Sequence, residues 1–231
     1  MLTNIFRDIF SLFYPNTCTL CSENLSYHET IICTFCLHDL PFTHYTTKAN
    51  NPVEKAFFGR IKLDAATALL FFQKNGKTQN LIHALKYKGK ESIGELLGQL
   101  TANKILSSTR FDNIDCIIPV PIHKEKEKIR GYNQLYLFGK TLAKEMQIAF
   151  YPNLLFKTSK SETQTRKQRY DRWINVNNSF SLLDSEKLKN KHVLLIDDII
   201  TTGATLEACS SELLKIDGLK LSLAAIAYTE Q

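Results

Sequence analysis

The sequence predicts an α/β protein in which a parallel sheet is flanked by helices and preceded by a small N-terminal zinc-ribbon-like module. Two observations lead to this class. From residue 63 onward, short apolar runs of strand length alternate with segments whose apolar residues recur at helical spacing. Such alternation is typical of a parallel sheet covered on both faces. Ahead of that region, four of the six cysteines are grouped between residues 18 and 36.

The alternating elements follow one another along the chain. We expect strands over 63–73, 115–120, 154–157, 193–197 and 221–227. Helices are expected around 81–85 and 93–100, separated by a turn at 87–90, and then over 133–146 and after residue 205. Cys116 and Cys209 fall inside these apolar patterns, so we expect them to be buried core thiols.

With 231 residues, of which 44% are hydrophobic, the chain can build a main domain with a small appendage. We expect an N-terminal helix and a four-cysteine module over 1–45, a linker over 46–56 and the main domain over 57–231. The linker prediction rests on the polar stretch TTKANNPVEK, and the helix on apolar residues at helical spacing between 5 and 13. No apolar run reaches the roughly 18 residues of a membrane span, and no signal peptide pattern is found, which predicts a cytoplasmic protein.

Two C-x-x-C pairs, CTLC and CTFC, carry Cys18, Cys21, Cys33 and Cys36. In a reducing compartment we do not expect disulfides among them. A tetrahedral zinc ion takes four thiolates, and a two-residue gap lets each pair bind one metal from a tight turn; four free thiols in a polar loop are the alternative. Since cysteine fills all four positions, the zinc is expected to be structural, and the nearby His28 and His38 are expected to lie on the surface.

The stretch VLLIDDIITTGAT, residues 193–205, joins an apolar strand to two aspartates and a Thr/Gly loop. It contains neither a Walker A loop nor a dinucleotide fingerprint. Gly203 lets the backbone bend close to a ligand, and successive N–H groups at a helix start form a cradle for an anion, as in a monophosphate pocket. Asp197 and Asp198, expected where the strand ends, can accept hydrogen bonds from vicinal sugar hydroxyls. The alternative is that Asp198 caps the following loop and Asp197 pairs with a basic neighbour.

This stretch resembles the 5-phosphoribosyl-1-pyrophosphate (PRPP) binding motif of the type I phosphoribosyltransferases. Three further blocks extend the resemblance: CTLC…CTFC, IIPVPIHKEKEKIRGYNQ at 117–134 and TQTRKQRYDRWINV at 163–176. In this order the four blocks are similar to the ComF family of competence-associated, phosphoribosyltransferase-like proteins. The resemblance spans nearly the whole chain and implies a type I phosphoribosyltransferase-like fold.

The resemblance implies roles for individual residues of this sequence. Asp197 and Asp198 would hold the ribose hydroxyls. The loop that would bind the 5-phosphate consists of Thr201, Thr202, Gly203, Ala204 and Thr205. After the strand at 115–120, Lys124 and Arg130 would meet pyrophosphate, and Arg130 is the better candidate because a KEKEK run is usually a solvated face. Asp197, Asp198 and Arg130 form the expected catalytic set.

A flexible loop often closes over the active site in this fold class, and the polar, basic segment at 159–172 occupies that place in the sequence. Arg166, Lys167 and Arg169 would reach pyrophosphate on closure. An unspecific mobile loop is the alternative. Trp173, just beyond the segment, would either stack on an acceptor base or anchor the loop by its apolar ring.

The reaction that the resemblance implies is pentosyl transfer, in which an unidentified acceptor displaces pyrophosphate at ribose C1. Mg²⁺ would be bound together with PRPP, because this ion prefers phosphate oxygens, water and a few carboxylates. A second hypothesis is a non-catalytic competence or DNA-uptake factor that senses PRPP or binds single-stranded DNA or competence proteins. The net charge of +6 is compatible with both. A purely structural adaptor is a third, against which the acidic pair argues.

Overall fold

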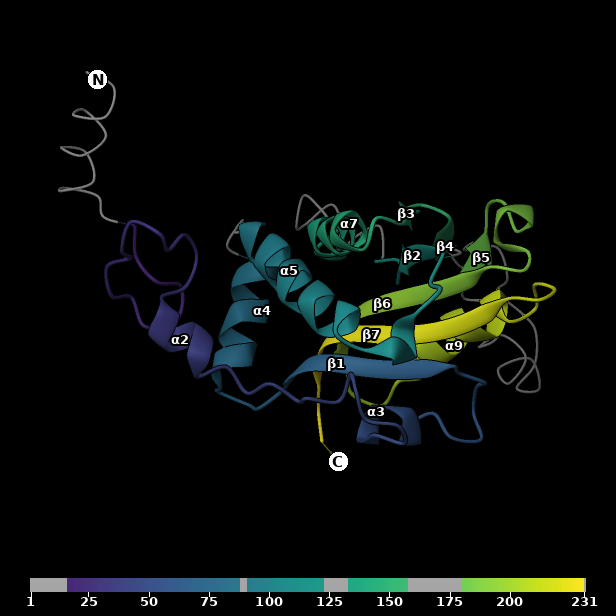
Figure 1. Ribbon diagram of the computed structural model, residues 1–231, viewed down its shortest axis with the longest axis horizontal. Coiled ribbons are helices and arrows are strands. Elements are labelled where there is room, and N and C mark those ends of the chain that lie inside the picture. Colours follow the sequence, from purple (N-terminus) through teal and green to yellow (C-terminus); the bar gives the residue numbers. More distant parts are fainter. Residues whose placement is uncertain (1–15, 88–90, 123–132, 158–179, 231) are drawn as a thin grey trace, which may run out of the picture.

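The computed structural model describes residues 16–87, 91–122, 133–157 and 180–230. Its main feature is a five-stranded sheet in the order β1-β7-β6-β2-β3 (Figure 1). The strands are β1 (Ala65–Phe71), β2 (Cys116–Pro119), β3 (Ala149–Phe150), β6 (His192–Ile200) and β7 (Lys220–Tyr228). Every pairing in this sheet is parallel, which confirms the predicted class and brings the carboxyl ends of the strands to one edge.

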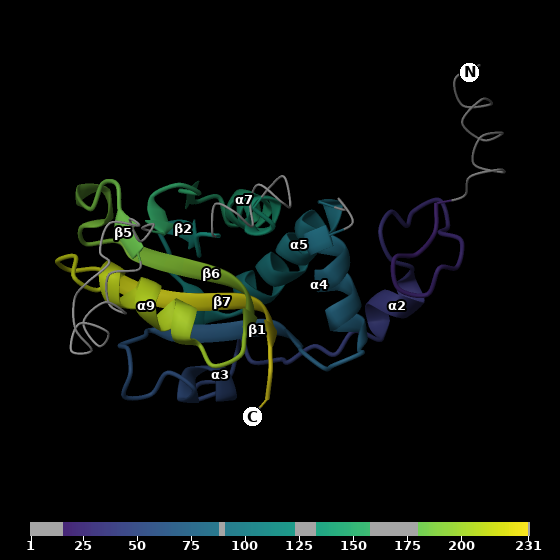
Figure 2. The same cartoon turned by 180° about the vertical axis from the view of Figure 1, so that it is seen from behind.

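Helices cover both faces of the sheet. They are α4 (Lys77–Tyr87), α5 (Ser92–Leu106), α7 (Leu135–Met146) and α9 (Ala204–Leu213). α5 and α7 pack together over one face, whereas α9 lies on the opposite face (Figures 1 and 2). α7 approaches β6 closely because Gly139 has no side chain: a Cβ at this position would lie 2.7 Å from the Cδ1 atom of Ile196.

Coverage of both faces explains why the central strands are continuous apolar runs. Residues 193–196 of β6 and 221–228 of β7 are all buried. Cys116 and Cys209 are 2% and 0% exposed, which confirms that they are core thiols. The strand expected at 154–157 is β4 (Leu155–Lys157), which pairs antiparallel with β5 (Phe180–Leu182) in a separate two-stranded sheet.

The outer edge of the sheet, strand β1, is covered by the chain that leads into the main domain. Phe42 forms an antiparallel bridge with Leu70. The Thr43 amide donates to the Leu69 carbonyl at 3.0 Å, and the Phe71 amide donates to the Pro41 carbonyl at 2.8 Å. The short helix α3 (Pro52–Lys55) also packs on β1. Residues 41–55 therefore lie against the edge strand.

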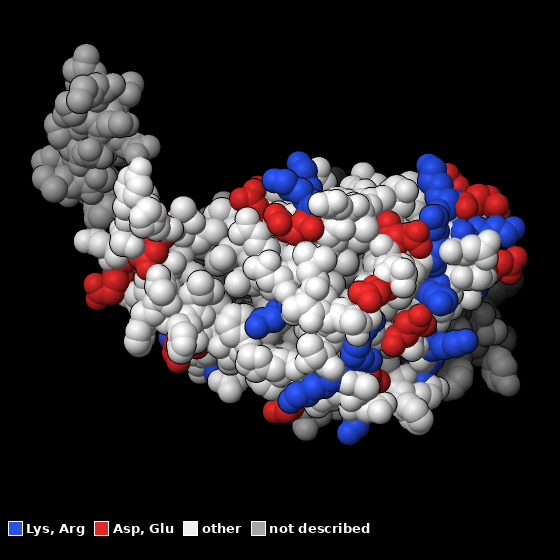
Figure 3. All heavy atoms as spheres, viewed as in Figure 1, with Lys and Arg blue, Asp and Glu red and all other residues white. Residues whose placement is uncertain are grey.

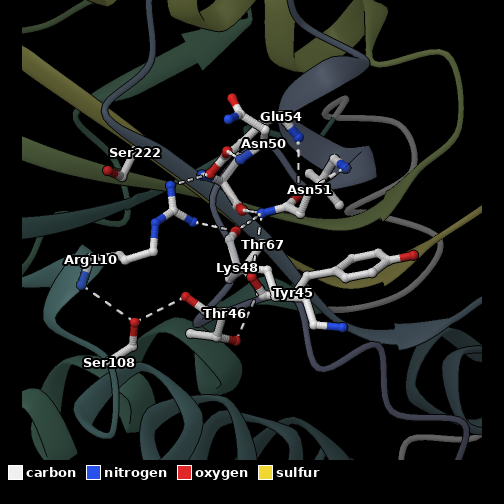
Figure 4. Close-up of polar contacts among 12 residues, drawn as sticks. Tyr45, Thr46, Lys48, Asn50, Asn51, Glu54, Thr67, Ser108, Arg110 and Ser222 are labelled. Atoms are coloured by element: carbon white, nitrogen blue, oxygen red, sulfur yellow. Dashed lines mark hydrogen bonds and ion pairs between the residues drawn. The ribbon is translucent and has the colours of Figure 1, made fainter.

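Polar side chains of the segment expected as a linker fasten it to β1 (Figure 4). Asn51 is 3% exposed, and its Nδ2 donates to the Ala66 carbonyl at 2.8 Å. Glu54 accepts from the Ala66 amide at 3.1 Å and pairs with Arg110 at 2.6 Å. Arg110 also donates to the Lys48 carbonyl at 2.7 Å. Residues 46–56 pack on the domain rather than standing free of it, and the domain boundaries at 45 and 57 stay predictions.

The remaining elements are short: α2 (Thr34–His38), η1 (Thr109–Phe111) and η2 (Glu186–Leu188). α2 belongs to the cysteine module and lies beside α4 in both views of the ribbon. Asp39, which follows α2, pairs with Lys77 in the first turn of α4. In the described part of the chain, no helix has the length and apolarity needed to cross a membrane. The predicted N-terminal helix at 5–13 lies outside the described residues.

The net charge of +6 is not gathered into one basic field on the face shown in Figure 3, as far as the described residues go. Lysine and arginine side chains are interspersed there with aspartate and glutamate. Toward the right-hand end of this face, several lysine and arginine side chains lie one above another, with acidic side chains beside them.

Candidate functional site

The acidic pair lies inside β6, so the prediction that the strand ends at Asp197 is wrong. β6 continues to Ile200, and its last residues pair with β7, Ile199 with Ala227 and Ile200 with Tyr228. The reason is that β7 supplies a long buried partner for the two isoleucines after the aspartates. The pair nevertheless remains at the carboxyl edge, where parallel sheets bind ligands.

Asp198 faces the side of the sheet that carries α4 and α7. Its Oδ2 forms an ion pair with the Nζ of Lys86, in the last turn of α4. Gln134, just before α7, donates its Nε2 to the same oxygen at 3.0 Å. The side chains of Lys86 and Asp198 are only 17% and 15% exposed, so this is a largely desolvated pair. Groups of two other parts of the chain thus hold the Asp198 carboxylate.

Asp197 is expected on the opposite side of the sheet from Asp198, because successive side chains of a strand alternate. Its Oδ1 accepts a hydrogen bond from the Asp198 amide at 2.8 Å. Burial, and next the negative charge of Asp198, raise the pKa of Asp197 to about 8, while the charge of Lys86 acts in the other direction. In the ligand-free protein, burial therefore favours the protonated form of Asp197.

The Thr/Gly loop follows β6 and leads into α9. Gly203 is the N-cap of α9 with φ of 74°, the left-handed region that favours glycine. A Cβ at this position would lie 2.6 Å from the Cε1 atom of Phe57, so both the conformation and the space require glycine. The other residues of the loop, Thr201, Thr202, Ala204 and Thr205, are exposed. Exposed hydroxyls and amides at a helix start are suited to an anion.

The basic residues predicted to meet pyrophosphate lie outside the described residues. They are Lys124 and Arg130 after β2, and Arg166, Lys167 and Arg169 of the predicted flexible loop. Trp173 lies outside them as well. The structure thus brings together the acidic pair and the Thr/Gly loop, and these five basic residues stay predictions.

Two residues of the site were not predicted from the sequence, Lys86 and Gln134. Gln134 is the last residue of the block IIPVPIHKEKEKIRGYNQ, so its place in that block was a signal that it belongs to the site. Lys86 stands in LIHALKYKGK, where nothing marks one lysine over the others. The neighbouring His83 is exposed on α4, as expected for a helix-surface histidine.

The four cysteines of the N-terminal module form one cluster. The sulfur atoms of Cys18, Cys21, Cys33 and Cys36 all lie within 4.8 Å of one another. The Cys21 and Cys33 sulfurs are 3.7 Å apart, and a tetrahedral ion with zinc–sulfur bonds of about 2.3 Å separates its ligands by about 3.8 Å. The donor set and its spacing fit a closed structural zinc site. His28 and His38 are exposed, as predicted.

Backbone amides already favour thiolates in this cluster. The Cys33 amide donates to the Cys18 sulfur at 3.3 Å, and the Cys36 amide to the Cys33 sulfur at 3.4 Å. Burial opposes ionisation of Cys18, but backbone donors, among them the amides of Cys21 and Cys33, bring its pKa down to about 6. Burial and neighbouring sulfurs raise the pKa of Cys36 to about 12. The four thiols cannot all ionise this close together unless a cation binds the resulting thiolates.

Comparison with known proteins agrees with this architecture. A family model described as "Phosphoribosyl transferase domain" matches residues 137–231, which include the acidic pair and the Thr/Gly loop. Competence protein F of Haemophilus influenzae is 31% identical over 140 residues, which cover 59% of this chain and 61% of that protein. DNA utilization protein YhgH of Escherichia coli O157:H7 is 28% identical over 138 residues, covering 58% and 60%.

Competence protein ComFC of Bacillus subtilis is 30% identical over 101 residues, which cover 43% of this chain and 38% of that protein. The chain thus spans about three fifths of the first two relatives and less of the third. Among solved structures, glutamine PRPP amidotransferase from B. subtilis is similar with a TM-score of 0.42 and 16% identity, covering 61% of this chain and 30% of that one. The chain is a homologue of competence protein F, ComFC and YhgH that combines a phosphoribosyltransferase-like domain with an N-terminal four-cysteine module.

Proposed function

We propose that the protein binds PRPP with Mg²⁺ at the carboxyl edge of the sheet and transfers its ribosyl group to an acceptor, with release of pyrophosphate. The observation that supports this most is the continuity of two subsites along one stretch of chain. Asp197 and Asp198 offer carboxylates to sugar hydroxyls, and the exposed loop 201–205 offers amides and hydroxyls to a 5-phosphate at the start of α9.

The residues of the chain supply binding and charge, and no covalent intermediate with the protein is needed. Lys86 and Gln134 hold the Asp198 carboxylate in place at the edge of the sheet. When bound with PRPP, Mg²⁺ would supply Lewis acidity to the leaving pyrophosphate. We assign the remaining charge stabilisation to Lys124, Arg130, Arg166, Lys167 and Arg169. Cys209 is buried, and burial raises the pKa of its thiol well above its usual range, so it is not a nucleophile here.

The cysteine module would bind one structural zinc ion, and the protein would act in the cytoplasm. The names of the relatives refer to competence and DNA utilization. On that basis we place the proposed activity in the context of DNA uptake, with competence proteins as candidate partners. The alternative is a non-catalytic factor that senses PRPP or binds single-stranded DNA.

The proposal is tested by thermal melting with PRPP and Mg²⁺. The wild-type protein should melt at a higher temperature with the ligand, since binding to the folded state alone stabilises it. Asp198→Asn should lose most of this shift. Asp184→Asn is the control, because Asp184 pairs with Lys187 and contacts none of the site residues that the structure describes. Absence of any shift in the wild-type protein would contradict the proposal.

Turnover requires a second measurement, release of pyrophosphate in the presence of candidate acceptors. Release that depends on an acceptor and is lost in Asp198→Asn supports transfer. Binding of PRPP without release by any base or amine offered would indicate a sensor. Strong binding of single-stranded DNA together with no response to PRPP would favour the nucleic-acid alternative.

A further inference from the structure

The Thr/Gly loop rests on a turn that comes from a distant part of the sequence. Residues 56–60, here named the supporting turn, follow α3. Phe57 of this turn is 1% exposed, and its ring occupies the space beside Gly203. The loop cannot shift toward the turn without displacing this buried ring. Phe57 therefore limits where the backbone at Gly203 can lie.

Arg60 fixes the other side of the same contact. Its Nη1 donates to the Thr202 carbonyl at 3.0 Å and to the Ala56 carbonyl at 3.0 Å. Its Nε donates to the Oε2 of Glu207 at 3.0 Å, and Nη2 pairs with the same carboxylate. One guanidinium thus joins the supporting turn, the Thr/Gly loop and the first turn of α9. The Thr202 carbonyl oxygen, the negative end of its dipole, is directed toward Arg60. It is therefore not directed toward an anion bound by the loop.

Arg60 has a second effect, on the charge near the proposed phosphate subsite, because it pairs with Glu207. Glu207 is the acidic residue in the first turn of α9, so its carboxylate lies near the amides that would receive a phosphate. A carboxylate there favours the helix but opposes an anionic ligand. The ion pair with Arg60 compensates this charge. The Arg60 and Glu207 side chains are 35% and 37% exposed, so the compensation is electrostatic support rather than a core contact.

We propose that Phe57 and Arg60 are positioning residues of the phosphate subsite: they hold the Thr/Gly loop in its anion-binding shape and neutralise Glu207. This inference rests on the proposed function, because it assigns how the same loop is prepared for a phosphate.

The test compares Arg60→Met with Arg110→Met. Arg110 is the control, because its guanidinium likewise binds a carboxylate, that of Glu54, and a backbone carbonyl, that of Lys48, but makes no contact with the Thr/Gly loop among the described residues. The probes are PRPP with Mg²⁺, ribose 5-phosphate and ribose, measured by titration calorimetry. Arg60→Met should weaken both phosphorylated probes about tenfold, the value of one charge-assisted hydrogen bond. Arg110→Met should change them by less than about twofold.

Equal weakening in the two variants, or none in Arg60→Met, would overturn the proposal. A second variant separates the two effects of Arg60. If charge compensation contributes, Glu207→Gln in the Arg60→Met background should recover part of the affinity for ribose 5-phosphate. If Arg60 acts only by positioning Thr202, the double variant should bind no better than Arg60→Met. That result would reject charge compensation of Glu207.

A ligand-free measurement keeps this inference separate from the proposed function. Amide hydrogen exchange at residues 201–205 should accelerate in Arg60→Met and remain unchanged in Arg110→Met, because only the former releases the loop. If the wild-type protein binds neither PRPP nor ribose 5-phosphate, the proposed function fails whatever the exchange shows. If the ligands bind but exchange and affinity are unaffected by Arg60→Met, the positioning role fails on its own.

Discussion

The cysteine module and the carboxyl edge of the sheet both crowd acidic groups together, and they compensate the resulting charge differently. At the edge, the chain itself compensates the charge: Lys86 and Gln134 bind the Asp198 carboxylate, and burial favours the protonated form of the neighbouring Asp197. In the module, four sulfurs lie within 4.8 Å of one another with backbone amides as donors. Amide dipoles compensate part of a thiolate's charge but do not cancel four of them.

The difference indicates which region folds by itself. The edge carries its own cation and can be formed before any ligand arrives, so a ligand must compete with or rearrange existing contacts. We propose that the module takes a cation from solution, so that its folding and its metal binding are one event.

The largest effect is expected from Cys33→Ser. A structural zinc ion contributes roughly 10 kcal/mol or more to the folding of a small metal module, and the variant removes one of its four ligands. We expect about one zinc per chain in the wild-type protein and almost none in the variant, measured by plasma mass spectrometry. Hydrogen exchange of residues 16–40 should become fast, while the sheet domain keeps its unfolding transition.

His28→Ala is the control for the zinc measurement. His28 is an exposed histidine of the same module and is not part of the cluster. It should retain the full zinc content. Wild-type protein purified without zinc, yet with slow exchange over residues 16–40, would show that the module folds without the ion.

Lys86→Met should have the next largest effect. It leaves the Asp198 carboxylate, 15% exposed, without its ion-pair partner. We expect a loss of roughly 2 kcal/mol in the free energy of unfolding, less than for a fully buried pair because Gln134 still donates to Asp198. The measurement is urea unfolding, and Lys86→Met combined with Asp198→Asn should recover part of the loss.

Lys191→Met provides the matched control for Lys86→Met. Lys191 pairs with Asp115 at 3.0 Å, but the side chains are 48% and 37% exposed. Such exposed pairs contribute little, so no measurable change in the unfolding midpoint is expected. If Lys86→Met and Lys191→Met change the unfolding midpoint equally, the Lys86 ion pair does not stabilise the carboxyl edge by compensating Asp198.

The pH dependence of stability reports on Asp197. Because burial and Asp198 raise its pKa to about 8, the folded state binds this proton more tightly than the unfolded state. The contribution of Asp197 to the free energy of unfolding is fully present below about pH 4 and is lost as the pH rises toward about 8. Asp197→Asn should therefore become more stable relative to wild type between pH 5 and 8. A difference in unfolding free energy that stays constant over this range would contradict the raised pKa.

The smallest effect concerns the contact between the cysteine module and α4. Lys77 of α4 pairs with Asp39 and lies 5.6 Å from the ring centroid of Phe35. Asp39 is 63% exposed, so the pair is screened by water. Lys77→Met should leave the zinc content and the unfolding midpoint unchanged. A loss of zinc in this variant would mean that α4 stabilises the module more strongly than the exposure of the Lys77–Asp39 pair indicates.

The fold class was predictable because burial on both faces produces continuous apolar runs, which the sequence displays directly. The end of β6 was not, because Ile199 and Ile200 extend the strand only by pairing with β7, and this pairing is not visible locally. Lys86 was missed for a similar reason, since its partner Asp198 lies on another element. In the polar stretch at 46–56, predicted as a linker, Asn51 binds a β1 carbonyl, a contact that the composition of the stretch does not reveal.

The strip of chain at 41–55 also bears on how the domain behaves when cut. Pro41, Thr43 and Asn51 of this strip form hydrogen bonds with backbone groups of the edge strand β1. A fragment beginning at residue 57 would leave those groups of β1 unpaired. Exposed edge strands pair with other chains, so such a fragment would self-associate. A soluble, monomeric fragment of the sheet domain must therefore begin before residue 41 and keep this covering strip.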